Sequence, residues 1–429
     1  MKYYSINSPQ RMVGLKEAVL KGLAEDKGLY MPKLIPQLPT SFFQNIDKLS
    51  LPEIAFETLK PFFCPDIDET HFASLVADAL NFEIPVKHIS ANIHTLELFH
   101  GPTCAFKDVG ARFMARILGE FVKGMDKEIN ILVATSGDTG SAVANGFYKV
   151  PGINVFVLYP KGLVSDVQEK QFTTLGQNIT AIEVNGTFDD CQRMVKEAFM
   201  DAELNSKMVL TSANSINLAR LLPQSVYYHY GYAQLKAQDK DDVVMCVPSG
   251  NFGNITAALV AARMGLPVKR FIAATNANDV VPQYLVNGKY QPRKSVATIA
   301  NAMDVGDPSN FVRIENLFEH QYEKVKANIE ACSFTDEEIR ATMKRVFEKT
   351  GYILDPHGAT GYEALERMLQ PSENGLFMET AHPAKFPEVV EPVIGQKVPV
   401  PDRLAAFFKG TKQAKEINAA LTDLKAVLI

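Results

Sequence analysis

Short apolar runs alternate along this chain with longer segments whose apolar residues recur at helical spacing. From residue 129 onward each run is followed by a turn and an amphipathic stretch, and the runs are INILVAT, INVFVLY, NITAIEV, VVMCVPS and RFIAAT. Strands that alternate with amphipathic helices are typical of a mostly parallel sheet with helices on both faces. The pattern therefore predicts an α/β fold built on open parallel sheets.

The sequence predicts where two of the helices begin. Ser165 and Gln168 bracket the start of VQEKQFTTLG, and Thr335 and Glu338 bracket the start of EIRATMKRVFEKTG, which ends at Gly351. Each pair has the spacing of a capping box, in which two side chains satisfy free backbone N–H groups at the helix start. We therefore expect one helix to begin just after Ser165 and another just after Thr335.

The first 95 residues differ from the rest of the chain in composition and in hydrophobic pattern. Prolines cluster there at positions 32, 36, 39 and 52, and strands do not clearly alternate with helices. We expect residues 1–95 to form a separate N-terminal unit and residues 96–429 the main region, with a smaller mobile subdomain at roughly 130–230. The last twenty-five residues are expected to form a polar surface helix.

Composition narrows the range of partners. Of 429 residues, 46% are hydrophobic and 22% are charged, so the chain can bury a full core. The net charge of −5 is interspersed and offers no broad basic surface for nucleic acid. The charged first thirty residues lack the apolar core of a signal peptide, and no apolar run is long enough to cross a bilayer. We expect a cytoplasmic protein with no nucleic-acid or membrane partner.

Cysteine and histidine spacing argues against a disulfide framework or a metal site. The five cysteines are odd in number and contain no C-x-x-C pair, and the eight histidines show no H-E-x-x-H or H-x-H spacing. We expect no bound metal. Any chemistry would then come from an organic cofactor or from side chains alone.

A first candidate for chemistry is the segment HGPTCAFKDVGARFMARILGEF. Gly101 and Pro102 mark a turn, and the apolar periodicity after them places Lys107 at or just before the first turn of a helix. The positive end of the helix and burial beside Phe106 would both lower the pKa of this lysine, which favours attack on an aldehyde. In isolation, however, such a lysine is more commonly solvated and paired with its neighbour, here Asp108.

A strand-to-helix turn in ATSGDTGSAVANGFY is suited to an anion. A buried strand runs through Ser136, Asp138 and Thr139 into a helix, so free backbone N–H groups face the carboxyl end of the strand. The turn is neither a Walker loop nor a full dinucleotide fingerprint. It favours a carboxylate or a phosphate, although a purely structural turn has the same pattern.

The segment VVMCVPSGNFGNITAALVAARMGL repeats this arrangement with a stronger signal for phosphate. Its two glycines let the backbone approach an anion closely, and a helix N-terminus completes the cradle. A tight turn without a ligand is the alternative. The residues of the turn are Gly250, Asn251, Phe252, Gly253 and Asn254.

A third candidate anion site lies in TSANSINLARLLPQ. Asn214 or Ser215 is expected to cap the helix that follows, and Arg220 lies within two turns of that end. A capped amphipathic helix with a surface arginine would have the same sequence. Three anion-suited helix starts in one α/β chain nevertheless favour a ligand with several negative groups.

Taken together, the motifs resemble the fold-type-II pyridoxal-phosphate enzymes, and among them the long bacterial and fungal threonine synthases. The matching segments are KEAVLKGLAEDKGLYMP, HGPTCAFKD, TSGDTGSA, SANSINLAR, PSGNFGN, ANAMDVGDPSN and ETAHPAKF, which cover nearly the whole chain in the family's order. The resemblance implies a fold like that of the tryptophan synthase β chain. Residues 96–429 would then be the catalytic region that binds pyridoxal 5′-phosphate.

The resemblance also implies an activity, the conversion of O-phospho-L-homoserine and water to L-threonine and phosphate in the last step of threonine biosynthesis. Lys107 would hold the cofactor through an imine and move the substrate proton. Residues 250–254 would hold the cofactor phosphate, and Thr380 would contact the pyridine nitrogen.

The remaining motif residues would face the substrate. Ser136, Asp138 and Thr139 would contact its carboxylate and the ring hydroxyl of the cofactor. Many fold-type-II relatives have Asn where this chain has Asp138, and an ionised acid cannot donate to the ring oxygen, so the role of Asp138 stays open. The substrate phosphate would be held by Asn214, Ser215 and Arg220.

Several alternatives remain at this level. His100, Cys104 and Asp108 border Lys107 and are interpreted as packing or orienting groups. The chain could be another fold-type-II lyase such as threonine dehydratase or cysteine synthase, whose substrates carry no phosphate. It could also be a non-catalytic homologue that binds a phosphorylated metabolite, or a nucleotide-binding regulator, although it has no P-loop lysine. Both a monomer and a homodimer are compatible with the sequence.

Overall fold

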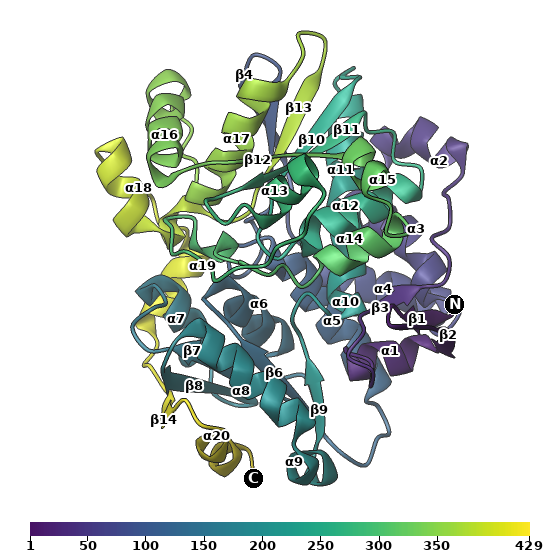
Figure 1. The fold of residues 1–429 in the computed structure, drawn as a ribbon, viewed down its shortest axis with the longest axis vertical. Helices are drawn as coiled ribbons and strands as arrows, with labels where there is room; N and C mark the ends of the chain where they lie inside the picture. Colours follow the sequence, from purple (N-terminus) through teal and green to yellow (C-terminus); the bar gives the residue numbers. More distant parts are fainter.

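The computed structural model describes all 429 residues and contains three β-sheets. Figure 1 shows the two larger sheets one above the other, with the small N-terminal sheet to one side. The strands are β1 (Tyr3–Ser5), β2 (Ser8–Val13), β3 (Tyr30–Pro32), β4 (Val86–Ser90), β5 (Ile93–Glu97), β6 (Ile129–Ala134), β7 (Ile153–Pro160), β8 (Ile179–Asn185), β9 (Val209–Ser212), β10 (Val243–Pro248), β11 (Arg270–Thr275), β12 (Ile329–Ser333), β13 (Asn374–Glu379) and β14 (Lys415–Asn418).

Helices connect nearly all of these strands. They are α1 (Leu15–Lys21), α2 (Thr40–Asn45), α3 (Leu51–Phe63), α4 (Glu69–Ala79), α5 (Lys107–Phe121), α6 (Asp138–Phe147), α7 (Asp166–Thr173), α8 (Phe188–Met200), α9 (Ala202–Lys207), α10 (Leu218–Leu221), α11 (Ser225–Lys236), α12 (Gly253–Arg263), α13 (Val280–Asn287), α14 (Phe311–Leu317), α15 (Tyr322–Asn328), α16 (Asp336–Thr350), α17 (Pro356–Met368), α18 (Pro387–Ile394), α19 (Asp402–Ala405) and α20 (Leu421–Leu428). No helix combines the length and apolar character needed to cross a membrane.

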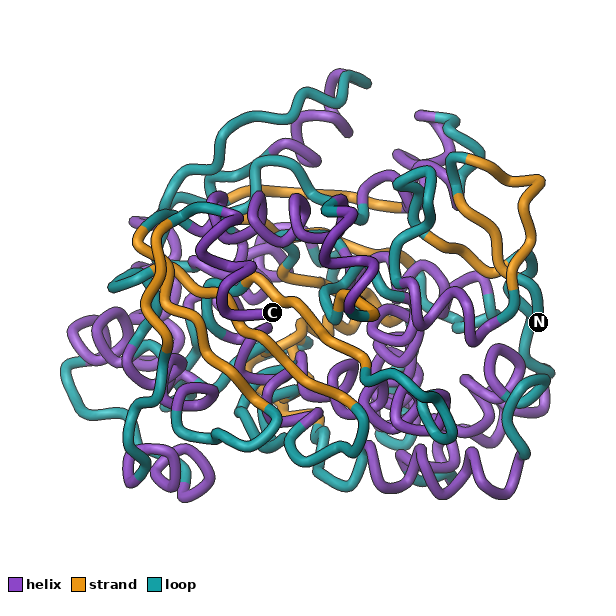
Figure 2. The backbone as a smooth tube through the Cα atoms, turned by 90° about the horizontal axis from the view of Figure 1, so that it is seen from below, coloured by secondary structure: helices purple, strands orange, loops and turns teal.

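The two larger sheets confirm the predicted α/β fold. One has the order β12-β11-β10-β13-β5-β4 and is parallel except for the edge strand β4, and the other has the order β14-β8-β7-β6-β9 and is parallel throughout. The predicted apolar runs form β6, β7, β8, β10 and β11. Figure 2 shows the strands of these sheets crossing the interior of the molecule, with helices on the outside.

Alternation along a single strand explains why helices cover both faces of each sheet. In β10, Met245 and Val247 enter the main hydrophobic core, whereas Val244 and Cys246 enter a second core beneath α16 and α17. Successive side chains of a strand point to opposite faces, so a strand that is apolar at every position must be covered twice. The sheet therefore lies in the middle of a three-layer region.

The N-terminal segment packs closely on the rest of the chain. Its sheet has the order β2-β1-β3, and its helices α3 and α4 place Phe63 and Phe72 against Phe113 of α5. The next two strands, β4 and β5, already belong to the six-stranded sheet. The N-terminal segment thus shares the main hydrophobic core of 77 buried residues with both larger sheets.

Helix starts were predicted with mixed success. Thr335 and Glu338 form the full capping box, and Gly351 ends that helix with φ 76°, in the left-handed region that favours glycine. At Ser165 only half of the box forms: Ser165 Oγ accepts from the Gln168 N–H, but Gln168 Oε1 accepts from the Ser165 hydroxyl and not from its backbone N–H. The expected cap at Asn214 or Ser215 is wrong, since Asn217 caps α10 and accepts from the Ala219 N–H.

The C-terminal segment also differs from the prediction. Residues 415–418 form β14, which adds a parallel strand to the edge of the five-stranded sheet beside β8, and only then does the short helix α20 follow. The run KEIN shows no apolar alternation because an edge strand exposes much of its surface. A polar strand of this kind carries little sequence signal.

Candidate active site

The residues predicted to carry chemistry gather where strands of both larger sheets end. Lys107 follows β5, the Ser136–Thr139 turn follows β6, and Thr380 follows β13. The other two predicted groups, residues 214–220 and 250–254, follow β9 and β10. Parallel strands bring their carboxyl ends to one edge of a sheet, and here the two edges face each other. An ion pair and several hydrogen bonds join turns of the two sheets directly.

Lys107 is the first residue of α5, as its sequence context predicted. The preceding turn is fixed because the Thr103 N–H and hydroxyl both donate to buried Asp108, at 2.8 and 2.7 Å. The chain is also pinned to the end of β13, where the Phe106 N–H donates to the Thr380 carbonyl at 2.8 Å. Asp108 therefore orients the turn and does not pair with Lys107.

The Lys107 side chain is deep in the protein and has no partner. Its Nζ lies 5.1 Å from the centroid of the Phe106 ring, makes no hydrogen bond or ion pair, and keeps some accessible surface. Burial lowers the pKa of Lys107, the charges of Lys385 and Arg220 lower it further, and Asp138 opposes them. A lowered pKa makes the neutral form of the amine easier to reach, and in that form it is a nucleophile and can accept a proton.

Asp138, the first residue of α6, forms a buried ion pair with a lysine that sequence reasoning did not include in the site. Lys385 Nζ lies 2.6 Å from Asp138 Oδ1, is itself fully buried, and also donates to the Thr103 carbonyl at 2.9 Å. Gln168 Nε2 donates to the same carboxyl oxygen at 2.8 Å. Burial opposes ionisation of Asp138, but Lys385 and Lys107 outweigh it and hold the pKa of this carboxyl well below its ordinary value.

The turn after β6 presents hydroxyl and amide donors. Thr135 Oγ1 accepts from the Gly137 and Gly140 N–H groups at 2.9 and 2.8 Å, so those amides are already satisfied. The amides and hydroxyls of Ser136 and Thr139 have no acceptor within the chain. Gly137 has φ 140°, and a Cβ there would lie 2.4 Å from the Gln168 side chain. This small set of free donors is suited to a carboxylate.

The turn after β10 is a backbone cradle. None of the amides of residues 250–254 donates to a group of the chain. Phe252 adopts the left-handed conformation with φ 57°, and a Cβ on Gly250 would lie 2.6 Å from the Met303 Cα, so the turn is closely packed. The Asn254 side chain is occupied by Ser249 Oγ and the Pro248 carbonyl. Consecutive free amides at a helix N-terminus are suited to a phosphate.

The turn after β9 contains the third predicted group. Asn214 Oδ1 is buried without a partner, and Ser215 Oγ accepts from Asn251 of the backbone cradle at 2.8 Å. Arg220 is buried; its guanidinium donates to the Ala213 carbonyl, and its Nε has no partner. Burial lowers the pKa of Arg220 to about 10, so it still carries its charge at neutral pH.

Thr380 completes the set. Its backbone carbonyl accepts from the Phe106 N–H, but its hydroxyl makes no hydrogen bond within the chain. Beside it, Glu379 is fully buried, accepts from the Asp355 N–H at 2.7 Å and leaves Oε2 without a partner. Burial raises the pKa of Glu379 well above its ordinary value. Glu379 lies in the apolar run GLFMET, which gave no signal that its carboxyl would be buried.

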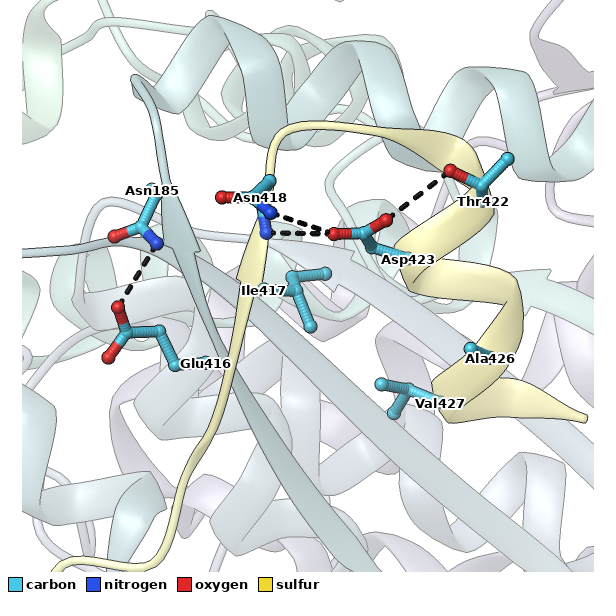
Figure 3. Close-up of a pocket in the computed structure, with 8 residues that line it drawn as sticks. All are labelled: Asn185, Glu416, Ile417, Asn418, Thr422, Asp423, Ala426 and Val427. Atoms are coloured by element: carbon cyan, nitrogen blue, oxygen red, sulfur yellow. Dashed lines mark hydrogen bonds between the residues drawn. The ribbon is translucent and has the colours of Figure 1, made fainter.

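A separate groove of about 510 Å³ lies far along the chain from these turns, between β14 and α20. Figure 3 shows its lining, in which Asn185 donates to Glu416 and Asn418 donates to Asp423. It has no lysine, no set of free amides and no buried charge. The groove is therefore a poor candidate for the active site.

The converging turns fit one particular cofactor. Pyridoxal phosphate has an aldehyde, a phosphate and a pyridine nitrogen, which require an unprotonated amine, an anion cradle and a polar contact respectively. These groups are the Lys107 amine, the backbone amides of residues 250–254 and the Thr380 hydroxyl, and none of them has a partner within the chain.

Comparison with known proteins agrees with this fit. The family model described as "Pyridoxal-phosphate dependent enzyme" matches residues 83–376, which is most of the chain. The fold and the site thus define a pyridoxal-phosphate-dependent enzyme. Two further family models, "Threonine synthase N terminus" and "Threonine synthase, C-terminal", match residues 2–80 and 358–428.

Individual relatives narrow the class further. Threonine synthase from Haemophilus influenzae is 45% identical over 429 residues and all of both chains. The crystal structure of threonine synthase from Escherichia coli is 42% identical, with a TM-score of 0.94 over 100% of this chain and 99% of that one. The pyridoxal-phosphate-bound threonine synthase from Brucella melitensis is 34% identical, with a TM-score of 0.93 over 100% and 98% of the two chains. The chain belongs to the threonine synthase family.

A solved structure with one of the alternative fold-type-II activities is much less similar to this chain. Threonine deaminase isoform 2 from Solanum lycopersicum is 17% identical, with a TM-score of 0.53 over 76% of this chain and 89% of that one. Such a likeness shows the shared fold alone.

Proposed function

We propose that this chain converts O-phospho-L-homoserine and water to L-threonine and phosphate. The observation that carries the proposal is the gathering of three groups of free anion donors around one lysine of lowered pKa. The cofactor and this substrate together carry two phosphates and one carboxylate. Each of these anions can therefore be assigned its own turn.

The assignment of ligands follows the donors. Residues 250–254 would hold the cofactor phosphate through their amides, and the Thr380 hydroxyl would contact the pyridine nitrogen. Ser136 and Thr139 would hold the substrate carboxylate. The substrate phosphate would be held by Asn214, Ser215 and Arg220.

The side chains of the site would have different roles in the reaction. The bound cofactor supplies an electron-withdrawing ring that acidifies the protons next to the substrate amino group. Lys107 Nζ takes and returns a proton there, which its lowered pKa permits. Asp138 stays ionised beside Lys385 and so accepts but does not donate hydrogen bonds near the ring. Burial of these groups keeps bulk water from the reacting atoms.

The domain organisation is part of the proposal. Residues 1–95 would buttress the site through α5, and residues 96–429 would bind the cofactor. The five-stranded sheet, most of which falls within 130–230, would move as a smaller unit when substrate binds. Its turns after β6 and β9 hold the proposed substrate contacts, whereas the cofactor cradle lies on the other sheet.

A dehydratase or cysteine synthase is the second candidate, because the lysine and the cofactor cradle would serve either. Its substrates carry no phosphate, so Arg220 and Asn214 would remain buried with unsatisfied atoms. That cost favours a phosphorylated substrate.

Incubation of the holoprotein with O-phospho-L-homoserine tests the proposal. Phosphate and threonine should appear in equal amounts, with an absorbance change of the bound cofactor. The matched control is Lys107→Ala, which should release both products at least about 10³-fold more slowly. Formation of 2-oxobutanoate and ammonia from threonine, without phosphate release from O-phospho-L-homoserine, would instead identify a dehydratase.

A further inference from the structure

Ser215 lies at the centre of a network that no sequence motif revealed. Its Oγ accepts a hydrogen bond from Asn251 Nδ2 at 2.8 Å and a second from Asn310 Nδ2 at 3.0 Å. Asn251 belongs to the backbone cradle after β10, and Asn310 immediately precedes α14. The network therefore joins the two proposed phosphate sites through one hydroxyl.

The direction of these hydrogen bonds is fixed by their outer partners. Asn251 Oδ1 accepts from the Ser309 N–H at 2.6 Å, and a backbone N–H can only donate. Asn310 Oδ1 accepts from Arg313 Nη1 at 2.7 Å, and a guanidinium can only donate. Asn310 Nδ2 also donates to the Asn251 carbonyl at 3.1 Å. Both amide NH₂ groups must therefore point at Ser215.

This arrangement determines what Ser215 can do. A hydroxyl has one hydrogen to donate and two lone pairs to accept with, and here both lone pairs are used. The Ser215 hydrogen has no acceptor within the chain. The hydroxyl is thus restricted to donation, and it suits a ligand atom that only accepts, such as an oxygen of a phosphate dianion.

Arg313 anchors the network from behind. It is fully buried and has no carboxylate partner, and it donates to the carbonyls of Ser215 at 3.1 Å, Ile216 at 2.7 Å and Tyr30 at 3.0 Å. Burial lowers its pKa to about 9, which still leaves it charged at neutral pH. Burying a guanidinium among neutral acceptors is costly. Tyr30 lies in β3, so the N-terminal segment shares in holding this turn.

We propose that Arg313 and Asn310 are positioning residues that hold Ser215 as a dedicated hydrogen-bond donor to the substrate phosphate. This inference rests on the proposed function and adds residues to it that do not touch the ligand. Arg313 sets the orientation of the Asn310 amide, and Asn310 sets the polarity of the Ser215 hydroxyl. Positioning by Arg313 also fixes the backbone of residues 215 and 216.

A double-mutant cycle with Asn310→Asp and Ser215→Ala tests the proposal. In Asn310→Asp a carboxylate replaces the amide NH₂ and accepts the Ser215 hydrogen, which removes the donor from the phosphate. Each single variant should bind inorganic phosphate about tenfold more weakly than the wild-type holoprotein, the value of one hydrogen bond to a charged group. In the Ser215→Ala background, Asn310→Asp should change binding less than about twofold.

Calorimetric titration of the holoprotein with inorganic phosphate gives these affinities. The bound cofactor occupies the cradle after β10, so the titration reports on the second phosphate site. Losses that add in the double variant would overturn the proposal, because simple charge repulsion from the introduced carboxylate would act whether or not Ser215 is present. An unchanged affinity in Asn310→Asp would overturn it equally.

Two further variants keep the test decisive. Asn316→Asp adds the same charge within α14, where Tyr4 donates to it from outside the network, and it should bind phosphate like wild type. If Asn310→Asp fails to fold, Asn310→Ala frees one lone pair of Ser215 and should weaken phosphate binding about two- to fivefold, again only when Ser215 is present. Failure of the proposed function would be seen separately, as no phosphate release from O-phospho-L-homoserine by the wild-type protein.

Discussion

The turn after β6 and the turn after β10 lie in the same strand–turn–helix arrangement but differ in which of their hydrogen-bonding groups are free. Each follows a buried parallel strand, contains a glycine and leads into a buried helix. After β10 the backbone amides of residues 250–254 are all free, while the polar side chains of Ser249 and Asn254 bond to each other. After β6 the Thr135 hydroxyl satisfies two amides, and a charged side chain, Asp138, faces the site.

The difference matters because backbone amides do not titrate and side chains do. A cradle of amides can hold a permanent anion across a wide pH range, which suits a cofactor. A turn with an ionised carboxylate and a partner lysine responds to nearby charge, which suits the place where a substrate arrives and leaves. Variants that act on one turn only can separate these two roles.

The largest effect is expected from Lys107→Ala, which removes the proposed cofactor-binding amine. Turnover should fall by about 10³-fold or more, since proton transfer by a positioned side chain contributes roughly 10²–10⁴-fold. Cofactor should still bind through the amide cradle but be lost on dialysis. Borohydride reduction and peptide mapping of the wild-type protein should place the label on Lys107. A label on Lys385 would show that the wrong lysine has been assigned.

Removal of Lys385, the buried partner of Asp138, should give the next largest effect, on stability and on the pH dependence of cofactor capture. Lys385→Met leaves a carboxylate unpaired, which typically costs about 3–5 kcal/mol in the free energy of unfolding. The pKa of Lys107 should rise as well, because a positive neighbour disappears and Asp138 is no longer neutralised. Only the neutral amine attacks an aldehyde, so cofactor capture by the apoprotein should require higher pH.

The control for this variant is Lys385→Arg, which keeps the charge. Its capture rate should follow the wild-type pH profile. An unchanged midpoint in Lys385→Met would mean that the ion pair does not tune the pKa of Lys107. A midpoint that moves to lower pH would mean that Asp138 takes up a proton when Lys385 is absent, which also contradicts the prediction.

A smaller effect is expected when the backbone cradle alone is changed. Gly250→Val would push a side chain against the Met303 Cα, 2.6 Å from the ideal Cβ, and displace the amides. Each lost hydrogen bond to a charged group costs about 1.5–3 kcal/mol, so cofactor affinity should fall about 10- to 100-fold in equilibrium dialysis. Gly14→Ala, where a Cβ meets no neighbour, is the control. Equal affinity in wild type and Gly250→Val would exclude the cradle as the phosphate site.

The smallest effect is expected from Thr135→Val, which makes the turn after β6 more like the turn after β10. The substitution keeps the shape of a buried residue but leaves the Gly137 and Gly140 amides without an acceptor. The free energy of unfolding should fall by about 1–3 kcal/mol in denaturant titrations. Thr135→Ser retains the hydroxyl and should lose less. If both variants lose equal stability, packing and not hydrogen bonding dominates at this position.

The sequence predicted the parts of the site whose signals are local. Apolar runs and glycine turns identified β6 and β10 and the turns after them, and the periodicity after Gly101 and Pro102 placed Lys107 at the start of α5. Each of these features depends on neighbours within a few residues. Pattern reasoning therefore works well for them.

Contacts between distant segments could not be predicted in this way. Lys385 stands in the motif ETAHPAKF, but nothing in its neighbourhood indicates a partner in the turn after β6. Arg313 lies on a short helix and reaches the carbonyls of Ile216 and Tyr30, which no charge pattern could have marked. Burial of a charge depends on the tertiary fold, and a single sequence records only the residue type.

The strand β14 has a consequence for how this protein is made. The five-stranded sheet begins at β6, yet its edge strand comes from residues 415–418, which are synthesised after all the other strands. Until then β8 presents an unpaired row of backbone groups, the kind of edge that recruits strands of other chains. A nascent chain thus holds an incomplete sheet until residues 415–418 are made, and a chain that stops before residue 415 would keep that exposed edge permanently.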